Sequence, residues 1–256
     1  MRKTKMRKPL IAGNWKMNGT RQLVAAYRRV LINADITRNV DVLVIPPFPY
    51  IGEMVRALLG SGVKVGAQTL NPRGAGAHTG EVSGVMLHEL GAEYVLVGHS
   101  ERRRLYKESE DEVFERASSA VSEQLCPILC VGETLEQHKS GNALAAVLHQ
   151  VSSVIERLDA RCLPWVSIAY EPVWAIGSGL TATPEQAQEV HAAIRGYLRQ
   201  RDPGLAETIR LLYGGSMNAH NARRLLSQPD IDGGLIGGSS LRPEDFLSIC
   251  HVAGQN

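Results

Sequence analysis

Three side chains that can move protons or stabilise charge each follow a short apolar segment. Lys16, His99 and Glu171 stand directly after the first, fourth and sixth of eight such segments. A carboxylate can act as a general base, an imidazole as an acid or a hydrogen-bond donor, and an ammonium group as a source of positive charge. If the fold brings the three segment ends together, this set of residues suits general acid–base catalysis.

Each of these side chains also has a structural interpretation when it is taken alone. Glu171 could form an ion pair at a rim, His99 could be a hydrogen-bonded structural histidine, and Lys16 could be a surface lysine. Pro172 restricts Glu171 to extended backbone conformations, which argues for a side chain held in one direction. Three such residues at the ends of apolar segments favour a shared function over three separate structural roles.

Two Gly-Gly-Ser turns indicate an anionic ligand. Gly214-Gly-Ser216 follows the seventh apolar segment, and Gly237-Gly-Ser239 follows the eighth, shortly before Pro243. Proline is common at the first position of a helix, and backbone N–H groups at such a position bind phosphate. Glycine also makes tight turns for conformational reasons alone, but two such turns after consecutive segments favour a phosphate group.

The elements that must position these residues are the apolar segments themselves, which recur about every 32 residues, the length of a βαβ unit. They are continuous rather than alternating, as is typical of parallel strands buried on both faces. The segments start near Leu10, Val42, Val63, Tyr94, Pro127, Val166, Ile209 and Gly234.

The stretches between these segments carry helix signals. Ser109 and Glu112 form a predicted capping box, as do Thr183 and Gln186, and Asn218 is expected to cap a third helix. The chain is therefore predicted to be α/β. Eight strand–helix repeats in 256 residues favour a (β/α)8 barrel of eight parallel strands with an outer ring of helices over an open doubly wound sheet.

The positive charge of the chain is concentrated at its N-terminus. The formal net charge is +2, and five of the first eight residues are Lys or Arg, so the remainder is net negative. A nucleic-acid-binding protein would carry its basic residues over a face of the folded domain. We expect residues 1–8 to be a solvated basic tail, residues 9–256 to form a single (β/α)8 barrel domain, and nucleic acid not to be a partner.

The same composition bears on location. No apolar run approaches the length of a membrane span, and the basic tail lacks the apolar stretch of a secretory signal. The four cysteines do not form a dense disulfide framework. We therefore expect a cytoplasmic protein that has no membrane partner.

Three motifs that could hold a metal or cofactor are incomplete. Cys126 and Cys130 have the spacing of a ligand pair, but two further zinc ligands are lacking nearby. The run His88-Glu-Leu-Gly-Ala92 lacks the second histidine of H-E-x-x-H, and Gly177-Ser-Gly-Leu-Thr-Ala182 lacks the acidic residue that follows a dinucleotide fingerprint. We expect neither a metal nor a cofactor.

Residues 172–182, directly after Glu171, have the composition of a hinged lid. Pro172 and Trp174 lead into Gly177-Ser-Gly179 and then into the second capping box. Stiff ends around small residues suit a segment that moves as a unit. Static packing of Trp174 is the alternative interpretation.

Five stretches make the sequence resemble the triosephosphate isomerase family, and they span nearly the whole chain after the tail. The stretches are Gly13-Asn-Trp-Lys-Met-Asn18, Gly98-His-Ser-Glu-Arg-Arg103, Ala169-Tyr-Glu-Pro-Val-Trp-Ala-Ile-Gly-Ser-Gly179, Tyr213-Gly-Gly-Ser216 and Gly234-Leu-Ile-Gly-Gly238. The resemblance implies an isomerase of glycolysis and gluconeogenesis. It would interconvert D-glyceraldehyde 3-phosphate and dihydroxyacetone phosphate through an enediolate, without a cofactor.

The resemblance also implies a role for each matching residue. Glu171 would be the base that moves a proton between C1 and C2, neutral His99 would polarise the carbonyl group, and Lys16 would supply positive charge. Asn14 would orient Lys16, and Glu101 would be a supporting carboxylate. The backbone groups implied to hold the phosphate belong to Gly177, Ser216, Gly237 and Gly238.

Members of this family are generally homodimers, which implies that the loop at residues 68–80 reaches a second copy of the chain. Thr79 would then lie near the partner's Asn14 and the partner's Lys16. From the residues alone, a long Gly-rich loop could instead be flexible. Departures from the family pattern, which bear on the lid and the dimer rather than on a catalytic group, are Ser178, Leu180, Ser239, Met217 and His78.

Two other classes of protein remain to be weighed. An aldolase-like barrel would use a lysine Schiff base, which needs a buried lysine of low pKa on a strand, whereas Lys16 is expected in a turn. A barrel kept as a binding or scaffold protein would be expected to lack at least one of Lys16, His99 and Glu171, and all three are present.

Overall fold

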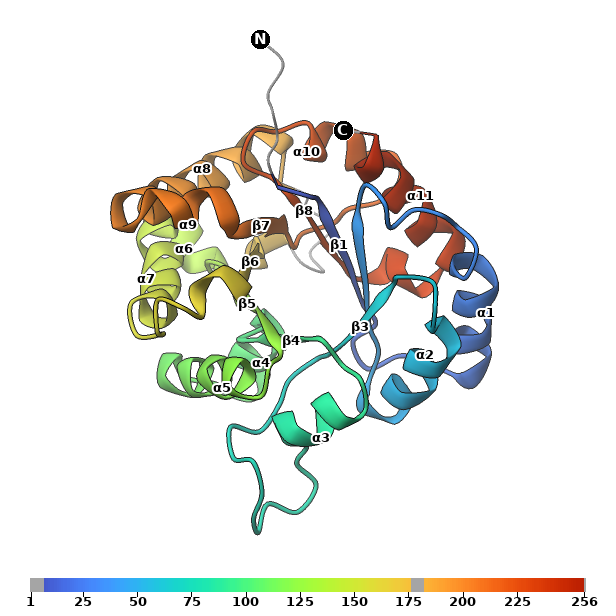
Figure 1. Cartoon of the computed structure of the whole chain (residues 1–256). Helices are drawn as coiled ribbons and strands as arrows, with labels where there is room; N and C mark the ends of the chain where they lie inside the picture. Colours follow the sequence, from blue (N-terminus) through green and yellow to red (C-terminus); the bar gives the residue numbers. More distant parts are fainter. Residues whose placement is uncertain (1–6, 176–181, 256) are drawn as a thin grey trace.

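The computed structural model describes residues 7–175 and 182–255. Its strands are β1 (Leu10–Asn14), β2 (Asp41–Ile45), β3 (Lys64–Ala67), β4 (Tyr94–Val97), β5 (Cys126–Val131), β6 (Ser167–Tyr170), β7 (Arg210–Tyr213) and β8 (Gly233–Ile236). They pair in parallel, in chain order, and β8 pairs with β1 to close a barrel. Helices surround the barrel on all sides (Figure 1). The predicted (β/α)8 barrel is confirmed.

The two faces of each strand bury different apolar side chains. Leu43, Leu96 and Leu212 pack together inside the barrel. The outward side chains, such as Val42, pack beneath the helices. Both faces are therefore shielded from water, which explains why the apolar segments are continuous. Closure depends on Gly233, where a Cβ would lie 1.9 Å from the carbonyl oxygen of Leu10.

Several helices begin at residues whose side chains cap them, such as Thr20 before α1 and Ser83 before α3. Both predicted capping boxes form, Ser109–Glu112 and Thr183–Gln186. The helices are α1 (Arg21–Leu31), α2 (Ile51–Leu58), α3 (Gly84–Glu89), α4 (Ser100–Leu105), α5 (Glu110–Ser122), α6 (Leu135–Lys139), α7 (Ala143–Ile155), α8 (Pro184–Arg201), α9 (Pro203–Thr208), α10 (Ala222–Leu226) and α11 (Pro243–Gly254). The short 3-10 turns are η1 (Phe48–Tyr50), η2 (Leu163–Trp165), η3 (Val173–Ala175) and η4 (Gly238–Leu241).

The expected cap at Asn218 is wrong in position. Helix α10 begins at Ala222, and its N-cap is Asn221, whose side chain makes no capping hydrogen bond. Asn218 instead accepts hydrogen bonds from the backbone N–H groups of His220 and Asn221. Its side chain therefore organises the turn that precedes the helix, as asparagine commonly does.

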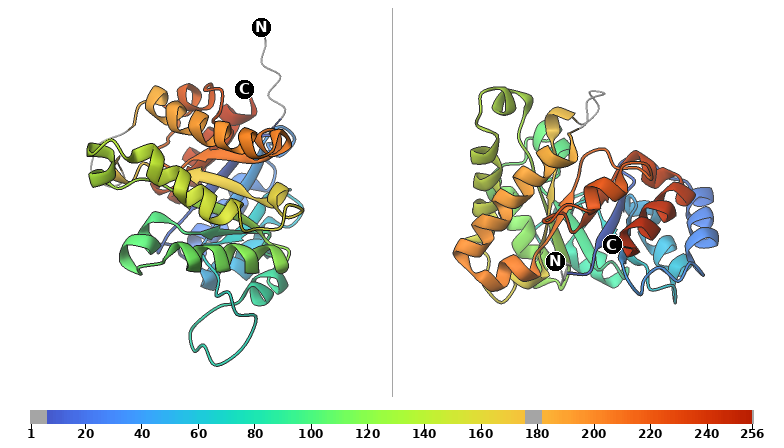
Figure 2. Two further views of the ribbon diagram at one scale, coloured as in Figure 1. Left: turned by 90° about the vertical axis from the view of Figure 1, so that its left-hand side faces the viewer. Right: turned by 90° about the horizontal axis from the view of Figure 1, so that it is seen from above.

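The loop at residues 68–80 extends well away from the barrel beside α3 (Figure 1, Figure 2). Thr79 lies on this loop and is exposed. At the start of the loop, Gln68 points back toward β1 and β2 and donates hydrogen bonds to the carbonyl oxygens of Lys16 and Ile45. The loop thus has an anchored base and an exposed tip.

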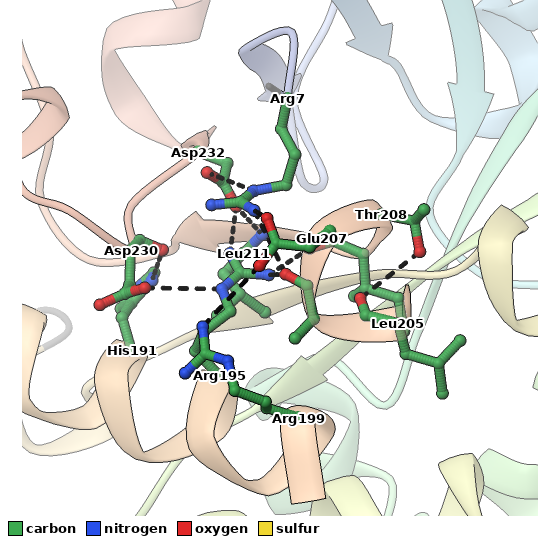
Figure 3. Close-up of polar contacts among 12 residues, drawn as sticks. Arg7, His191, Arg195, Arg199, Leu205, Glu207, Thr208, Leu211, Asp230 and Asp232 are labelled. Carbon is green, nitrogen blue, oxygen red and sulfur yellow. Dashed lines mark hydrogen bonds and ion pairs between the residues drawn. The ribbon is translucent and has the colours of Figure 1, made fainter. Parts of the chain in front are cut away.

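Arg7 departs from the expectation of a solvated tail, because its side chain packs on the barrel, whereas Lys8 stays exposed and forms an ion pair with it. Arg7 Nε lies 3.0 Å from a carboxylate oxygen of Asp232, which is fully buried. Arg195 of α8 pairs with the other oxygen of that carboxylate (Figure 3). Lys8 lies 2.8 Å from Asp41 at the start of β2. These ion pairs fasten the chain at the amino ends of the strands.

The described ranges also bear on membranes and metals. Among the helices placed there, none combines the length and the hydropathy that crossing a bilayer requires. In the same residues, no group of three or more His, Cys, Asp or Glu side chains is arranged to hold a metal ion.

Candidate active site

A cavity of about 500 Å³ opens where the strands end. It brings together Lys16 after β1, His99 after β4 and Glu171 after β6, which lie far apart in the sequence. The glycine-rich turns after β7 and β8 line the same cavity between Glu171 and Lys16. Its full lining is Asn14, Lys16, His99, Glu101, Arg104, Glu171, Gly214, Gly215, Ser216, Met217, Asn218, Leu235, Gly237, Gly238 and Ser239.

Lys16 is held in a backbone conformation that lysine rarely adopts, with φ at 52°. Its N–H donates to Oδ1 of Asn14 at 2.9 Å, and its carbonyl oxygen accepts from Nε2 of Gln68 at 2.7 Å. Its Nζ lies 2.6 Å from Oε1 of Glu101. The surrounding groups therefore fix both the backbone and the charged end of Lys16, as expected where strain persists at a functional site.

Glu171 is almost fully buried, and both of its carboxylate oxygens are occupied. Oε2 accepts the backbone N–H of Ser100 at 2.9 Å, while Oε1 lies 3.2 Å from the Ser100 hydroxyl and 3.0 Å from Nε2 of His99. Burial alone raises the pKa of Glu171. His99, the Ser100 N–H and the charge of Lys16 outweigh burial and hold that pKa below the ordinary glutamate value.

His99 caps helix α4 with its own ring. Nδ1 accepts the backbone N–H of Glu101 at 3.2 Å, so we assign the proton to Nε2, which then donates to Glu171. Burial alone lowers the pKa of His99, but Glu171 and Glu101 outweigh it and raise that pKa above the ordinary histidine value. We take the ring in this arrangement as neutral, since a protonated Nδ1 could not accept the hydrogen bond from Glu101.

Glycine at positions 214 and 215 makes room for the carboxylate. A Cβ at Gly214 would lie 2.8 Å from Cγ of Glu171 and 3.0 Å from the carbonyl oxygen of Tyr170. A Cβ at Gly215 would lie 2.3 Å from the hydroxyl of Tyr213. These contacts are shorter than packing permits, so the first Gly-Gly-Ser turn is required for the close approach of the chain after β6.

The second Gly-Gly-Ser turn leads directly into η4, which begins at Gly238. The first N–H groups of such a turn have no acceptor within it. A Cβ at Gly237 would lie 3.7 Å from Cε of Lys16, so this turn and the lysine charge face the same space. Ser216, from the first turn, is exposed and lines the same cavity, and its carbonyl oxygen accepts from Nδ2 of Asn221.

The remaining expected residues fall into two groups. Gly177, Ser178 and Leu180 lie outside the described residues, as does most of the segment expected to be a lid. Thr79 is described, but it lies on the extended loop and is not part of the cavity of its own chain.

Two residues with clear geometric roles were missed by the sequence analysis. Ser100 binds both oxygens of Glu171, and Gln68 fixes the backbone of Lys16. Ser100 directly follows His99 in the same motif, and Gln68 directly follows β3, so both stand at the rim where polar residues gather. Their position at this rim is the feature of the sequence that could have identified them.

The side chains in this cavity can accept and donate protons, and the comparisons with known proteins show which family the chain resembles. Residues 9–253 match the family model described as triosephosphate isomerase. A triosephosphate isomerase of Chromohalobacter salexigens is 60% identical over 248 residues, which cover 97% of this chain and 100% of that protein. One of Paracidovorax citrulli is 50% identical over 250 residues, with 96% and 99% covered. One of Pseudomonas putida strain W619 is 49% identical over 251 residues, with 97% and 100% covered.

Proposed function

This chain belongs to the triosephosphate isomerase family, and from that premise we propose how its residues share the interconversion of D-glyceraldehyde 3-phosphate and dihydroxyacetone phosphate. The observation that carries the proposal is the meeting of Lys16, His99 and Glu171 in one cavity beside two glycine-rich turns. Aldose and ketose differ only in the position of two hydrogens. The reaction therefore needs a base, a group that polarises the carbonyl and a site for the phosphate.

We assign the base to Glu171. It moves a proton between C1 and C2 of the triose phosphate, and its lowered pKa keeps it ionised for that purpose. Both of its oxygens are engaged by Ser100 and His99 in the present arrangement. The carboxylate must release at least one of these contacts to reach a substrate carbon, and Gly214 leaves the space that this movement needs.

His99 and Lys16 act on the substrate oxygens. When Glu171 moves toward the substrate, His99 loses the neighbour that raises its pKa, and burial then favours the neutral ring. Neutral Nε2–H can polarise the carbonyl group and return a proton to the developing enediolate. Asn14 orients Lys16, whose charge stabilises the enediolate, and Glu101 holds the lysine side chain in place.

We assign phosphate binding to the backbone at Ser216, Gly237 and Gly238, and to Gly177 in the segment outside the described residues. The start of η4 at Gly238 and the nearness of Gly237 to Lys16 support the described part of this site. The reaction moves protons within one molecule and transfers no electrons to an acceptor. For that reason we propose that it proceeds without a cofactor.

We propose a homodimer in which Thr79 reaches the cavity of a second copy. A groove of about 580 Å³ beside the cavity is lined in part by Met17, Gln68 and Tyr106. Met17 is 94% exposed and Tyr106 67% exposed, which is unusual for large apolar side chains that lie close together. The extended loop of a second copy would cover them.

The domain organisation and the cellular location of the protein are also proposals. We propose that residues 9–256 act as a single domain and that the protein is cytoplasmic. Residues 1–8 form a basic segment of which Arg7 and Lys8 form ion pairs with the barrel.

The two alternative classes fit the geometry less well. Schiff-base formation requires a neutral, desolvated lysine, whereas the side chain of Lys16 is 31% exposed and paired with Glu101. A scaffold protein has no need for a carboxylate buried between His99 and Ser100. Interconversion of the two triose phosphates by the purified protein, with borohydride trapping as a check for a lysine adduct, tests these possibilities. Turnover without an adduct supports the isomerase, and an adduct at Lys16 contradicts it.

A further inference from the structure

Glu133 is a buried carboxylate that the reaction does not use. It lies between β5 and α6 and is 1% exposed. Its Oε1 accepts hydrogen bonds from the indole N–H of Trp174 at 2.6 Å and from the hydroxyl of Tyr170 at 3.0 Å. Its Oε2 has no hydrogen-bond partner within residues 7–175 and 182–255. A buried carboxylate is costly unless an opposite charge lies nearby.

His138 is the group that can supply this charge. Its Nδ1 lies 3.5 Å from Oε1 of Glu133, and across the described ranges no Lys or Arg forms an ion pair with that carboxylate. The imidazole also stacks on the indole of Trp174, with ring centroids 4.4 Å apart and planes inclined by 24°. The side chain is 39% exposed, so it can exchange protons with solvent.

Few other charged groups face this imidazole. The packed turn η3 presents Trp174, which does not titrate, and α7 has His149, which is exposed, as its only titratable side chain. Helix α6 itself adds Glu136 and Lys139. Tyr170 shares Glu133, but burial raises its pKa so far that its hydroxyl stays protonated. Glu133 is therefore the charge that the imidazole meets directly.

Trp174 is mechanically linked to the proposed base. It lies three residues after Glu171, and Pro172 stiffens the chain between them. Glu171 must give up contacts with Ser100 or His99 before it can reach a substrate, and the short, stiff link to Trp174 couples the position of the base to that of the indole. Any group that holds the Trp174 indole therefore favours the resting arrangement of Glu171.

We propose that His138 is a positioning residue for the isomerisation, which with Glu133 holds Trp174 in the resting arrangement and holds it more tightly when the imidazole is protonated. This inference rests on the proposed role of Glu171. Protonation turns the contact with Glu133 into an ion pair and adds a cation–π interaction with the indole. Imidazole changes its charge between about pH 5 and 8, so the restraint strengthens as the pH falls.

Fluorine NMR of protein labelled with 5-fluorotryptophan detects the contact between His138 and Trp174 independently of catalysis. The chain has three tryptophans, and Trp174→Phe assigns the signal of interest. We expect the Trp174 resonance to shift between about pH 8 and pH 5.5 and to lose that shift in His138→Phe, which keeps a ring without the charge. The control His251→Phe changes an exposed histidine on α11 and should keep the shift. A Trp174 resonance that ignores pH in the wild type, or that titrates equally in His138→Phe, overturns the proposal.

Kinetics test the consequence for the reaction. The ratio of kcat/KM in His138→Phe to that in the wild type should rise about two- to fivefold as the pH falls through the same range. His138→Arg, which carries a permanent charge, should have a lower kcat/KM than His138→Phe at every pH. A ratio that does not change with pH contradicts the positioning role. If the wild type did not isomerise triose phosphates, the proposed function would fail, while the fluorine titration would still decide whether His138 governs Trp174.

Discussion

Nε2 of His99 lies 3.0 Å from Oε1 of Glu171, so the proposed electrophile and the proposed base contact each other directly. The contact affects both partners, since it lowers the pKa of Glu171 and raises that of His99. The Nε2–H of His99 and the carboxylate of Glu171 therefore stabilise each other in this contact. Under the proposed mechanism, Glu171 must leave this contact before it can reach a substrate carbon.

His99→Gln should move the acid limb of activity to higher pH. Glu171 has a lowered pKa in the folded protein, so its ionised form contributes stability above the ordinary glutamate range and loses it as the pH falls through the lowered pKa. Without His99, burial is still opposed by the Ser100 N–H and Lys16 but no longer by the imidazole, so the pKa of Glu171 rises and the carboxylate protonates at a higher pH. Carbon-13 NMR of labelled glutamate in the free protein measures the change directly. An unchanged titration of Glu171 in the variant would show that His99 does not control it.

Gly214→Ala should impair catalysis by displacing the base. The new Cβ would lie 2.8 Å from Cγ of Glu171, and a shift of about 1 Å in a catalytic group can cost about 10²-fold in rate. The matched control is Gly196→Ala on α8, where a Cβ meets nothing within 4 Å. That control should keep full kcat and gain about 0.5–1 kcal/mol of stability from helix propensity. Equal kcat in the two variants would argue against a requirement for space at Gly214.

Gln68→Met should weaken the site through Lys16. The variant leaves the carbonyl oxygens of Lys16 and Ile45 without the Gln68 donor, and it frees a backbone held at a φ of 52°. We expect kcat/KM to fall about tenfold, in line with the loss of about 1–3 kcal/mol at an unsatisfied group. Steady-state kinetics beside the exposed control Gln22→Met measure this difference. Identical kcat/KM values in the two variants would remove Gln68 from the site.

Arg7→Met should lower stability without changing turnover. Asp232 is fully buried and would keep Arg195 as its remaining cation, so we expect a loss of about 1–3 kcal/mol in the free energy of unfolding. Arg21→Met removes an arginine whose side chain is 87% exposed and should cost less than about 0.5 kcal/mol. Urea denaturation measures both. Arg7 acts at the amino ends of the strands, so a fall in kcat of Arg7→Met would contradict its purely structural role.

The barrel could be predicted because burial on both faces leaves a direct mark on the sequence. Continuous apolar runs identified all eight strands, and the structure places each strand start within one residue of the expected position. The two capping boxes could also be predicted, because each is a local pattern of four residues. The prediction that Asn218 caps a helix was wrong, because an asparagine side chain can organise a turn as well as cap a helix.

Contacts between distant segments could not be predicted in the same way. Nothing within the first ten residues shows that Arg7 meets Asp232, which lies over two hundred residues later in the chain. The hydrogen bonds from Ser100 to Glu171 and from Gln68 to Lys16 likewise depend on closure of the barrel, which brings separate strand ends to one rim. The sequence showed which residue types gather there, and the fold decides which of them touch.

The central claim is that Glu171 moves the proton, and a comparison of Glu171→Gln with the wild type tests it most directly. Interconversion of the two triose phosphates should be measured in a coupled assay, with Glu115→Gln as the control because it changes an exposed carboxylate on α5. The account predicts rapid turnover in the wild type and the control, and a loss of about 10³-fold in kcat for Glu171→Gln. Wild-type turnover that persists in a folded Glu171→Gln variant would contradict it.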